Sequence, residues 1–405
     1  MQSIRGEELK SVEIEKIMPD RPIYLDYHAT TPVDERVLAA MLPYFTENFG
    51  NPASISHIYG WEAEAAVKQA REILADAINA TPEEIVFTSG ATEANNLAIK
   101  GVAEAYFQKG QHIITVATEH HAVLDPCKYL KSLGFEITIL SVQKDGLIDL
   151  TELEKAFRSD TILVSVMAAN NEIGVLQPLA EIGSRCRDAG IIFHTDAAQA
   201  IGKIPLDVQT MKVDLMSLTA HKVCGPKGIG ALYVRRRNPR VQLASQQHGG
   251  GHERGMRSGT LYTPQIVGFR KAVEIALQEQ ATETQRLTQL RQRLWEQIKQ
   301  LKGIHLNGHS TQRLPGNLNI SIEGVDGSAL LLGLQSVMAI SSGSACSSAM
   351  TAPSHVLTAL GNSEQLAYAS LRFGIGRFNT VEEIDRVAAH VVSTIQSLRK
   401  QATFV

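Results

Sequence analysis

The chain has few cysteines and no excess of charge of one sign. Four cysteines occur among 405 residues. None belongs to a Cys-x-x-Cys pair or stands near histidines at the spacing of a zinc site, which argues against a disulfide framework and against a bound metal. Lysine and arginine number 39 against 42 acidic residues, a net charge of −3. No overall basic field is therefore available to attract nucleic acid.

Long hydrophobic runs are also missing. The longest, residues 162–169, is broken by Ser165 and is far shorter than the ~20 residues that span a bilayer. Residues 1–20 mix acidic, basic and apolar side chains and contain no unbroken apolar core of a signal peptide. We therefore expect a cytoplasmic protein without a membrane partner.

The composition is that of a globular protein. Hydrophobic residues make up 44% and charged residues 20% of the chain, values that exclude collagen-like, low-complexity and wholly disordered classes. At ~150 residues per domain, the length predicts two to three domains.

Short β-rich runs alternate with helix-like segments over residues 84–234. Several runs are apolar on both faces, which is typical of strands covered by helices on each side. This alternation predicts an α/β domain with a doubly wound, mostly parallel sheet. The predicted strands cover residues 85–88, 113–117, 137–142, 162–167, 191–195, 215–218 and 229–234, and predicted helices include 93–107 and 178–189.

The pattern changes after residue 250. Residues 266–280 and 283–301 are predicted as two long amphipathic helices, the second linking two domains. Thr380 and Glu383 form the capping box of a terminal helix. Together with short β-like runs, these features predict a smaller α+β domain; the runs cover residues 305–306, 318–322, 338–340 and 371–375.

Three junctions that follow predicted strands contain candidate functional residues, which gain meaning when they are considered together. The turn at Ser89–Thr92 suits an anion at a helix N-terminus, although Thr92 is equally a good N-cap. Asp196 ends a strand where ligands of α/β sheets bind, although it can simply cap the next helix. Lys222 is a Schiff-base candidate, although most lysines are only solvated. Together they are the three groups that hold the phosphate, ring nitrogen and aldehyde of pyridoxal phosphate.

The residues around these junctions resemble the cysteine desulfurases of pyridoxal-phosphate fold type I. The resemblance runs from Tyr24 to Arg377 and is carried by Thr195-Asp196-Ala197-Ala198-Gln199, Thr219-Ala220-His221-Lys222 and Gly225-Pro226-Lys227-Gly228. It implies that Lys222 binds the cofactor aldehyde, that Asp196 keeps the ring nitrogen protonated, and that the phosphate is contacted by Ala91, Thr92, Thr219 and His221. It also implies a large domain over residues 34–275 and a small domain formed by residues 1–33 and 276–405.

Two further motifs gain a role only from the resemblance. In Thr118-Glu119-His120-His121 the family's ring-stacking and proton-transferring histidine corresponds to His120, whereas read alone the histidine can lack any role. In Asn170-Asn171-Glu172-Ile173-Gly174 the family's contacts imply that Asn171 binds the cofactor ring hydroxyl and the substrate, with Gln199 beside it. An Asn-Asn pair by itself indicates turn chemistry.

The glycine-rich stretch of residues 249–260 reads locally as a flexible loop or a loose anion site. The family uses the matching segment to deliver a threonine to the phosphate held by the other subunit. The resemblance therefore implies a homodimer with Thr260 crossing the interface.

The string Ser342-Gly343-Ser344-Ala345-Cys346 places a thiol among small residues that leave the backbone free. It resembles the long-loop class of cysteine desulfurases, which marks Cys346 as the nucleophile that becomes a persulfide; the bland alternative is a serine-rich turn. Cys127, Cys186 and Cys224 read as structural. Arg372 corresponds to the family's planar, bidentate partner for the substrate α-carboxylate. The resemblance places His28 near the site, and no role follows for it.

The sequence thus predicts a transferase that converts L-cysteine to L-alanine, with the sulfur held on Cys346 and passed to an acceptor protein for iron–sulfur cluster assembly or thiolation. The rival activities are another fold-type I enzyme, such as a selenocysteine lyase or an aminotransferase, and a non-catalytic sulfur-relay subunit.

Overall fold

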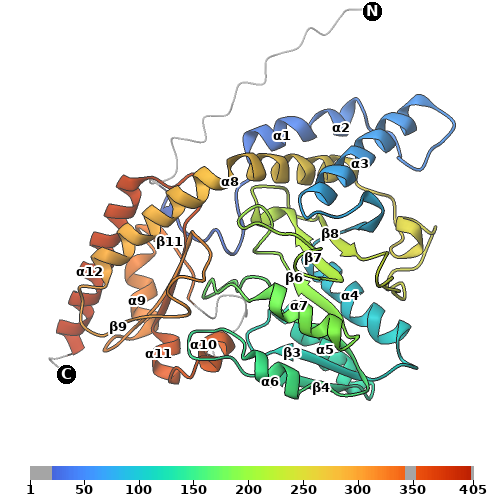
Figure 1. Ribbon diagram of the computed structural model, residues 1–405. Coiled ribbons are helices and arrows are strands. Elements are labelled where there is room, and N and C mark those ends of the chain that lie inside the picture. Colours follow the sequence, from blue (N-terminus) through green and yellow to red (C-terminus); the bar gives the residue numbers. More distant parts are fainter. Residues whose placement is uncertain (1–20, 343–352, 403–405) are drawn as a thin grey trace, which may run out of the picture.

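The computed structural model describes residues 21–342 and 353–402, and its largest element is a seven-stranded sheet (Figure 1). The strand order is β2-β8-β7-β6-β5-β3-β4. The strands are β2 (Ile85–Thr88), β3 (His112–Val116), β4 (Glu136–Leu140), β5 (Thr161–Ser165), β6 (Ile192–Asp196), β7 (Leu215–Thr219) and β8 (Gly230–Val234). All seven lie within two residues of the predicted runs.

Strand β8 alone runs antiparallel to its neighbours, β2 and β7, while β3 to β7 are parallel. The prediction of a mixed, mostly parallel α/β sheet is confirmed. The carboxyl ends of the parallel strands meet at one edge, where the loops that carry Asp196 and Lys222 leave the sheet.

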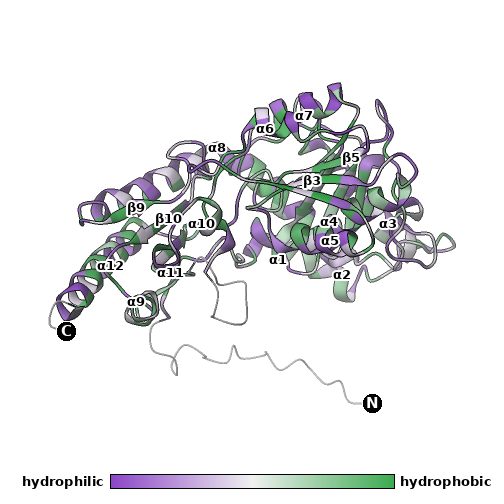
Figure 2. Cartoon of the chain, turned by 90° about the horizontal axis from the view of Figure 1, so that it is seen from below, coloured by the Kyte–Doolittle hydropathy of each residue, from purple (hydrophilic) through white to green (hydrophobic). Residues whose placement is uncertain are grey.

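Helices cover both faces of the sheet because successive strand residues point to opposite sides. Ile113 packs in a cluster with α4 (Ala91–Ala105) and α5 (His121–Ser132), whereas Ile114 packs in another with α3 (Ile58–Asp76) and α7 (Leu179–Asp188). Figure 2 shows hydrophobic residues in the strands, between the two helical layers. The remaining helices of this unit are α1 (Glu35–Met41), α2 (Pro43–Thr46) and α6 (Leu150–Lys155).

One helix, α8 (Thr263–Ile298), replaces the two long helices predicted after residue 250. That prediction was wrong because Ala281 and Thr282, the exposed residues between the two predicted helices, are neither glycine nor proline and continue the helix. The first half of α8 packs on the large sheet through Ile266 and Phe269, and the second half packs elsewhere through Leu290 and Leu294. Figure 1 shows α8 crossing from one part of the molecule to the other.

The second part is built on a three-stranded antiparallel sheet of order β12-β10-β9 and a two-stranded parallel pair, β1 with β11. The terminal helix α12 begins at a capping box, which is confirmed: Glu383 N–H donates to Thr380 Oγ1 at 3.2 Å and Thr380 N–H donates back at 3.1 Å. The elements are β1 (Ile23–Tyr24), β9 (Ile304–Leu306), β10 (Asn317–Ile322), α9 (Gly327–Leu334), β11 (Met338–Ala339), α10 (His355–Ala359), α11 (Glu364–Tyr368), β12 (Ser370–Gly374) and α12 (Val381–Ala402).

Ile23 and Leu25 pack with this second core. The domain division at residue 275 stays a prediction, and α8 runs across it without a break. Within the described residues, no helix is both long and apolar enough to cross a membrane.

Candidate active site

A cleft of about 520 Å³ lies at the carboxyl edge of the parallel strands. Among the residues that the structure describes, its lining includes every predicted site residue except Thr260: Ala91, Thr92, His120, Asn171, Asp196, Gln199, Thr219, His221, Lys222 and Arg372. These residues come from both parts of the molecule, since Arg372 lies on β12 and the others on or beside the large sheet. Topology therefore brings distant motifs to one place.

The wall formed by the start of α4 is suited to an anion. Gly90, with a φ of +151°, is the N-cap, so Thr92 lies inside the first turn and is not the cap. First-turn N–H groups have no acceptor within a helix and carry partial positive charge. Glu93 accepts from Ser89 N–H at 2.7 Å and forms an ion pair with Arg257. The N–H groups that remain to bind an anion are therefore those of the first turn of α4.

Close backbone packing shapes this wall. A side chain at Gly230 would come within 2.7 Å of Gly90 Cα, so the glycine on β8 lets the β2–α4 turn lie flat against the sheet. Thr219 Oγ1 lies 3.9 Å from the place of a Cβ at Gly90. Backbone and hydroxyl donors thus face the same space.

Asp196 lies at the end of β6 and is buried. Its Oδ2 accepts from Asn95 Nδ2 at 2.7 Å, and its Oδ1 accepts from Ala198 N–H at 2.9 Å. The local turn bond is the capping role that the sequence left open, but Asn95 on α4 also fixes the carboxylate. Asp196 has no ion-pair partner in residues 21–342 and 353–402, so it offers a negative charge to a cationic ligand atom.

A second buried carboxyl, Glu119, lies near Asp196 and stays neutral. Burial and, after it, the charge of Asp196 raise the pKa of Glu119 well above its usual range. Two carboxylates in one buried region rarely ionise together. The negative charge of this region is thereby concentrated on Asp196.

Lys222 reaches the cleft from the 3₁₀ turn of residues 220–222 that follows β7. Its Nζ donates to the main-chain oxygens of His28 and Ala29 at 2.5 and 2.6 Å. Next to it, burial first and the Lys222 charge second lower the pKa of His221 to about 4, so His221 is a neutral imidazole whose Nδ1 lies 3.2 Å from Thr30 Oγ1.

His120 lies in the cleft and His121 does not. His120 caps α5, and its Nδ1 accepts from Ala122 N–H at 3.0 Å, which leaves Nε2 to carry the ring proton. Burial, as the largest cause, lowers the pKa of His120. His121 is exposed, with its ring 5.1 Å from that of His355.

The Asn170-Asn171 pair divides the two roles that the sequence left open. Asn170 Oδ1 accepts from Glu172 and Ile173 N–H at 2.8 and 2.9 Å, which is turn chemistry. Asn171 lines the cleft, and its main-chain oxygen accepts from Arg372 Nη1 at 3.3 Å.

Arg372 is buried and held by Asp26. Nη2 donates to Asp26 Oδ1 at 2.7 Å, and Ser341 Oγ donates to Asp26 Oδ2 at 2.9 Å. Arg372 Nε has no hydrogen-bond partner among the described residues. The guanidinium is therefore oriented by one carboxylate and keeps a donor for another.

Glu172 is a buried carboxyl next to Asn171. Ser354 Oγ donates to Glu172 Oε2 at 2.5 Å, and the Glu172 main-chain oxygen accepts from Asn317 and Asn319. Burial raises the pKa of Glu172 to about 7, and the hydrogen bond from Ser354 and the charge of Arg372 oppose this rise.

Glu172 predicts a dependence of stability on pH. From its usual pKa of 4.5 up to about 7, the unfolded chain releases this proton while the folded chain keeps it, so stability falls as pH rises and levels off above pH 7. The loss amounts to about 3 kcal/mol at most. We expect Glu172→Gln, which keeps an acceptor for Ser354, to remove this contribution.

Urea unfolding at pH 5 and pH 8 measures the effect. Stability of the Glu172→Gln variant relative to wild type should rise between the two pH values, whereas the exposed Glu181→Gln control should show no such change. Parallel behaviour of Glu172→Gln and wild type would contradict the assignment.

Thr260 is exposed and lies outside the cleft. Its loop is more firmly tied than the local interpretation as a flexible loop suggested, because Glu253 pairs with Arg71 at 2.6 Å and accepts from Phe87 N–H at 2.7 Å. Thr260 is therefore an exposed residue on a loop that is anchored to the rest of the chain.

Cys346 lies outside the described residues. Of the other cysteines, Cys127 and Cys186 are buried in α5 and α7, and burial raises the pKa of Cys127 to about 12. Cys224, also buried, has a raised pKa, with burial as the largest cause. None of these three is a thiolate nucleophile at neutral pH. Within the described residues, no His, Cys, Asp and Glu side chains group as a metal site.

Sequence reasoning missed several residues that shape the site. Asn95, Asp26 and Glu119 each contact or neighbour a predicted residue, whereas His28, which the resemblance placed near the site without a role, accepts from Lys222 Nζ through its main-chain oxygen. The only sequence signals were a polar Asn-Asn pair in an otherwise apolar helix face for Asn95, and the position of Asp26 in the Tyr24–Tyr27 motif.

Comparison with known proteins agrees with this geometry. The family model of the class-V aminotransferases matches residues 23–387. The chain belongs to this family.

Closer relatives narrow the class. The chain is 57% identical to cysteine desulfurase IscS of Shewanella sp. strain ANA-3 over 383 residues, 94% of each chain, and 57% identical to the IscS of Proteus mirabilis over 380 residues, 93% and 94% of the two chains. Within the family, the chain is therefore a cysteine desulfurase.

Solved structures give the same result. A NifS-like protein matches with a TM-score of 0.86 at 37% identity, covering 93% of this chain and 100% of its own. A structure described as SspA in complex with cysteine matches with a TM-score of 0.79 at 41% identity, covering 88% of this chain and 100% of its own.

Proposed function

We propose that this enzyme uses pyridoxal phosphate to convert L-cysteine to L-alanine and to carry the sulfur as a persulfide on Cys346. The observation that supports this most is the meeting of three groups in one cleft: the start of α4, the unpaired carboxylate of Asp196 and the amine of Lys222. Their chemistry fits a ligand that has a phosphate, a basic ring nitrogen and an aldehyde.

The described residues fit this cofactor group by group. The helix start, Thr92, Thr219 and the neutral His221 would hold the phosphate. Asp196, oriented by Asn95, would keep the ring nitrogen protonated, and Asn171 and Gln199 would face the ring hydroxyl. Once bound, the cofactor would supply an electron sink for negative charge at the substrate Cα.

The side chains of the cleft also provide for the substrate. The related structure described as SspA in complex with cysteine supports L-cysteine as the ligand. Arg372 would bind the α-carboxylate with the donors that Asp26 leaves open. Lys222 Nζ would then remove the Cα proton, and His120, with its proton on Nε2, would assist transfer above the ring.

Cys346 would carry out the sulfur transfer. Its thiolate attacks the substrate Sγ and forms an S–S bond, while the Cβ–Sγ bond breaks and its electron pair stays with Cβ. Cβ then takes up a proton, Lys222 returns a proton to Cα, and L-alanine leaves. The persulfide sulfur is passed to an acceptor protein in the cytoplasm for iron–sulfur cluster assembly or thiolation.

The anaerobic reaction of wild type and Cys346→Ala with L-cysteine tests this function. Wild type should release alanine and gain one protein-bound sulfane sulfur per site, and the variant should do neither while keeping the visible cofactor band. The buried Cys127→Ala variant is the matched control and should behave as wild type.

Full alanine formation by Cys346→Ala would contradict the nucleophile. A cofactor band without alanine from either protein would remove the desulfurase reaction and leave another fold-type I activity. Absence of any band would favour a non-catalytic relay subunit.

We also propose that two copies of the chain complete each active site. An exposed apolar patch adjoins the Thr260 segment, and the rings of Phe45 and Tyr262 lie 6.2 Å apart within it. Such a patch on a soluble protein marks an interface. The rings of Phe49 and Tyr59 lie 5.5 Å apart, and the exposed large hydrophobic residues of this part of the chain are Leu42, Phe45, Phe49, Ile55, Ile58, Tyr59, Trp61 and Tyr262.

The occupant that we propose is a second copy of the chain, with Thr260 crossing to the partner's phosphate site. Sedimentation of the holoenzyme should give the mass of a dimer. A monomer of full activity would contradict both the interface and the role of Thr260.

A further inference from the structure

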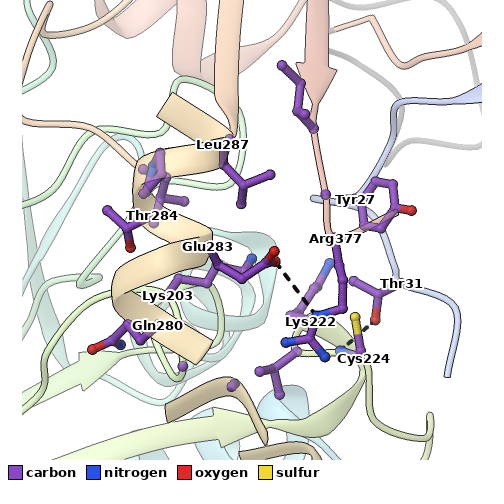
Figure 3. A pocket seen from close by; sticks show the side chains of 18 of the residues that line it. Tyr27, Thr31, Lys203, Lys222, Cys224, Gln280, Glu283, Thr284, Leu287 and Arg377 are labelled. Atoms are coloured by element: carbon purple, nitrogen blue, oxygen red, sulfur yellow. Dashed lines mark hydrogen bonds and ion pairs between the residues drawn. The ribbon is translucent and has the colours of Figure 1, made fainter. Parts of the chain in front are cut away.

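His28 lies in the wall between the cleft and a second cavity of about 80 Å³. Figure 3 shows this cavity, with Gln280, Glu283, Thr284 and Leu287 of α8 on one side and Tyr27, Thr31, Cys224 and Arg377 on the other. Of the residues that line it, only His28 and Lys222 also line the cleft. His28 is 3% exposed, so its ring nitrogens depend on protein or ligand partners.

Hydrogen bonds around Gln199 decide the tautomer of His28. Gln199 Nε2 donates to the His28 main-chain oxygen at 2.8 Å, and Gln199 Oε1 accepts from Lys203 Nζ at 2.8 Å. The amide is thereby oriented with its oxygen toward the ring. His28 Nδ1, 3.3 Å from that oxygen, must carry the proton and donate it.

The other ring nitrogen is consequently a bare acceptor. His28 Nε2 is buried and has no hydrogen-bond partner among the described residues. A buried polar atom without a partner is destabilising, so it usually serves a function or a ligand.

Positive charges keep this ring neutral. Burial is the largest cause that lowers the pKa of His28, followed by the charge of Lys203, the charge of Arg372 and, more weakly, that of Lys222. The ring therefore accepts a hydrogen bond without taking the proton.

The same charges locate the ring relative to an amino-acid substrate. The Lys222 amine is bound at the His28 main-chain oxygen, which marks where an amino group is held, and Arg372 is the predicted carboxylate partner. His28 lines the same cleft as both of these residues. An α-amino group that replaces the Lys222 amine arrives beside this imidazole.

We propose that His28 Nε2 accepts a hydrogen bond from the α-amino group of the amino-acid substrate, with Gln199 and Lys203 as the positioning residues that fix the tautomer. This proposal rests on the proposed function and adds a substrate-binding residue to it. No proton leaves the substrate to His28, since burial first, and then the neighbouring charges, lower the pKa of the ring well below its usual range.

The test compares wild type, His28→Phe and His28→Gln as holoenzymes. Phenylalanine keeps the size of the ring and removes the acceptor, whereas glutamine keeps an acceptor. The change of the visible band on titration with L-alanine gives the dissociation constant. A hydrogen bond to a charged donor predicts that His28→Phe weakens L-alanine binding roughly ten- to a hundredfold, and that His28→Gln recovers most of it.

A substrate analogue without the amino group separates this role from a structural one. The inhibition constant of 3-mercaptopropionate, which keeps the carboxylate and thiol, should be the same in wild type and His28→Phe. A parallel rise for both ligands would mean a merely structural role and would overturn the proposal.

Nitrogen NMR of the imidazoles gives a readout that is independent of the cofactor. In cofactor-free protein labelled with ¹⁵N-histidine, the resonances lost in His28→Phe should be those of an Nδ1–H tautomer; an Nε2–H tautomer would overturn the proposal. His112→Phe, a buried histidine whose nitrogens are both bonded to threonines, is the matched control and should leave L-alanine binding unchanged.

The outcomes distinguish this proposal from the proposed function. Equal L-alanine binding by wild type and His28→Phe removes the role of His28 and leaves the desulfurase. A wild type whose visible band does not respond to L-cysteine or L-alanine would overturn the proposed function, and the substrate contact with it.

Discussion

Replacement of Lys222 by alanine should lower alanine formation from L-cysteine at least ~10³-fold, because one side chain is assigned both the covalent hold on the cofactor and the proton transfer at Cα, and general acid–base catalysis alone contributes ~10²–10⁴. Lys222 Nζ is placed in the cleft by the main-chain oxygens of His28 and Ala29. With alanine at position 222, no amine lies beside these two main-chain oxygens.

Two measurements check this expectation. Initial rates give the loss of turnover, and borohydride reduction followed by peptide mass analysis should attach the cofactor to the Lys222 peptide in wild type alone. The exposed Lys144→Ala variant is the control and should keep wild-type turnover and labelling. Attachment at another lysine, or turnover above a tenth of wild type, would contradict the assignment.

Replacement of Asp196 by asparagine should have the second largest effect. The buried carboxylate has hydrogen bonds from Asn95 and Ala198 and no ion pair in the described part of the chain, so the cofactor nitrogen would be its only cationic partner. Loss of one member of a buried charge pair costs about 3–5 kcal/mol, which corresponds to a rate loss of roughly 10²–10⁴.

Turnover and the pH dependence of the visible band measure this effect together. The band of Asp196→Asn should change with pH near neutrality as its ring nitrogen loses the proton that Asp196 holds in wild type. Asn95→Ala, which removes one hydrogen bond and keeps the charge, should lose only about tenfold. Wild-type turnover in Asp196→Asn would remove the carboxylate from the mechanism.

Six strands of the large sheet were predictable because they are buried on both faces and therefore read as mostly apolar runs, whereas the edge strand β4 is partly exposed. The site residues at their carboxyl ends followed in part from the same pattern, since Asp196 ends such a run and Lys222 lies three residues beyond the end of β7. In contrast, α8 was divided wrongly, because a polar interval on an exposed face looks like a break when the sequence is read in windows.

Contacts between distant segments were not predictable. Asp26 orients Arg372 across 346 positions, and Glu172 binds Ser354 across 182. Neither pair has a local pattern, because each depends on how two units of the fold come together. The tautomer of His28 is a further case, since it is set by Gln199 and Lys203, two residues that nothing in the Tyr27–Thr31 segment indicates.

The Asn170-Asn171 pair shows a different limit. The sequence offered turn chemistry and ligand contact as alternatives, and the two neighbouring residues divide them, because one side chain points back to the turn and the other lines the cleft. The sequence indicates both a turn and a ligand contact, but it does not show which asparagine has which role.

The uninterrupted helix α8 couples the unfolding of the two hydrophobic cores. Its 36 residues form a rod of about 54 Å, with one half packed under the large sheet and the other half in the second core. Neither core can melt without stripping apolar neighbours from a helix that the other core still holds. We infer that heat or denaturant takes the subunit apart in a single cooperative transition rather than domain by domain.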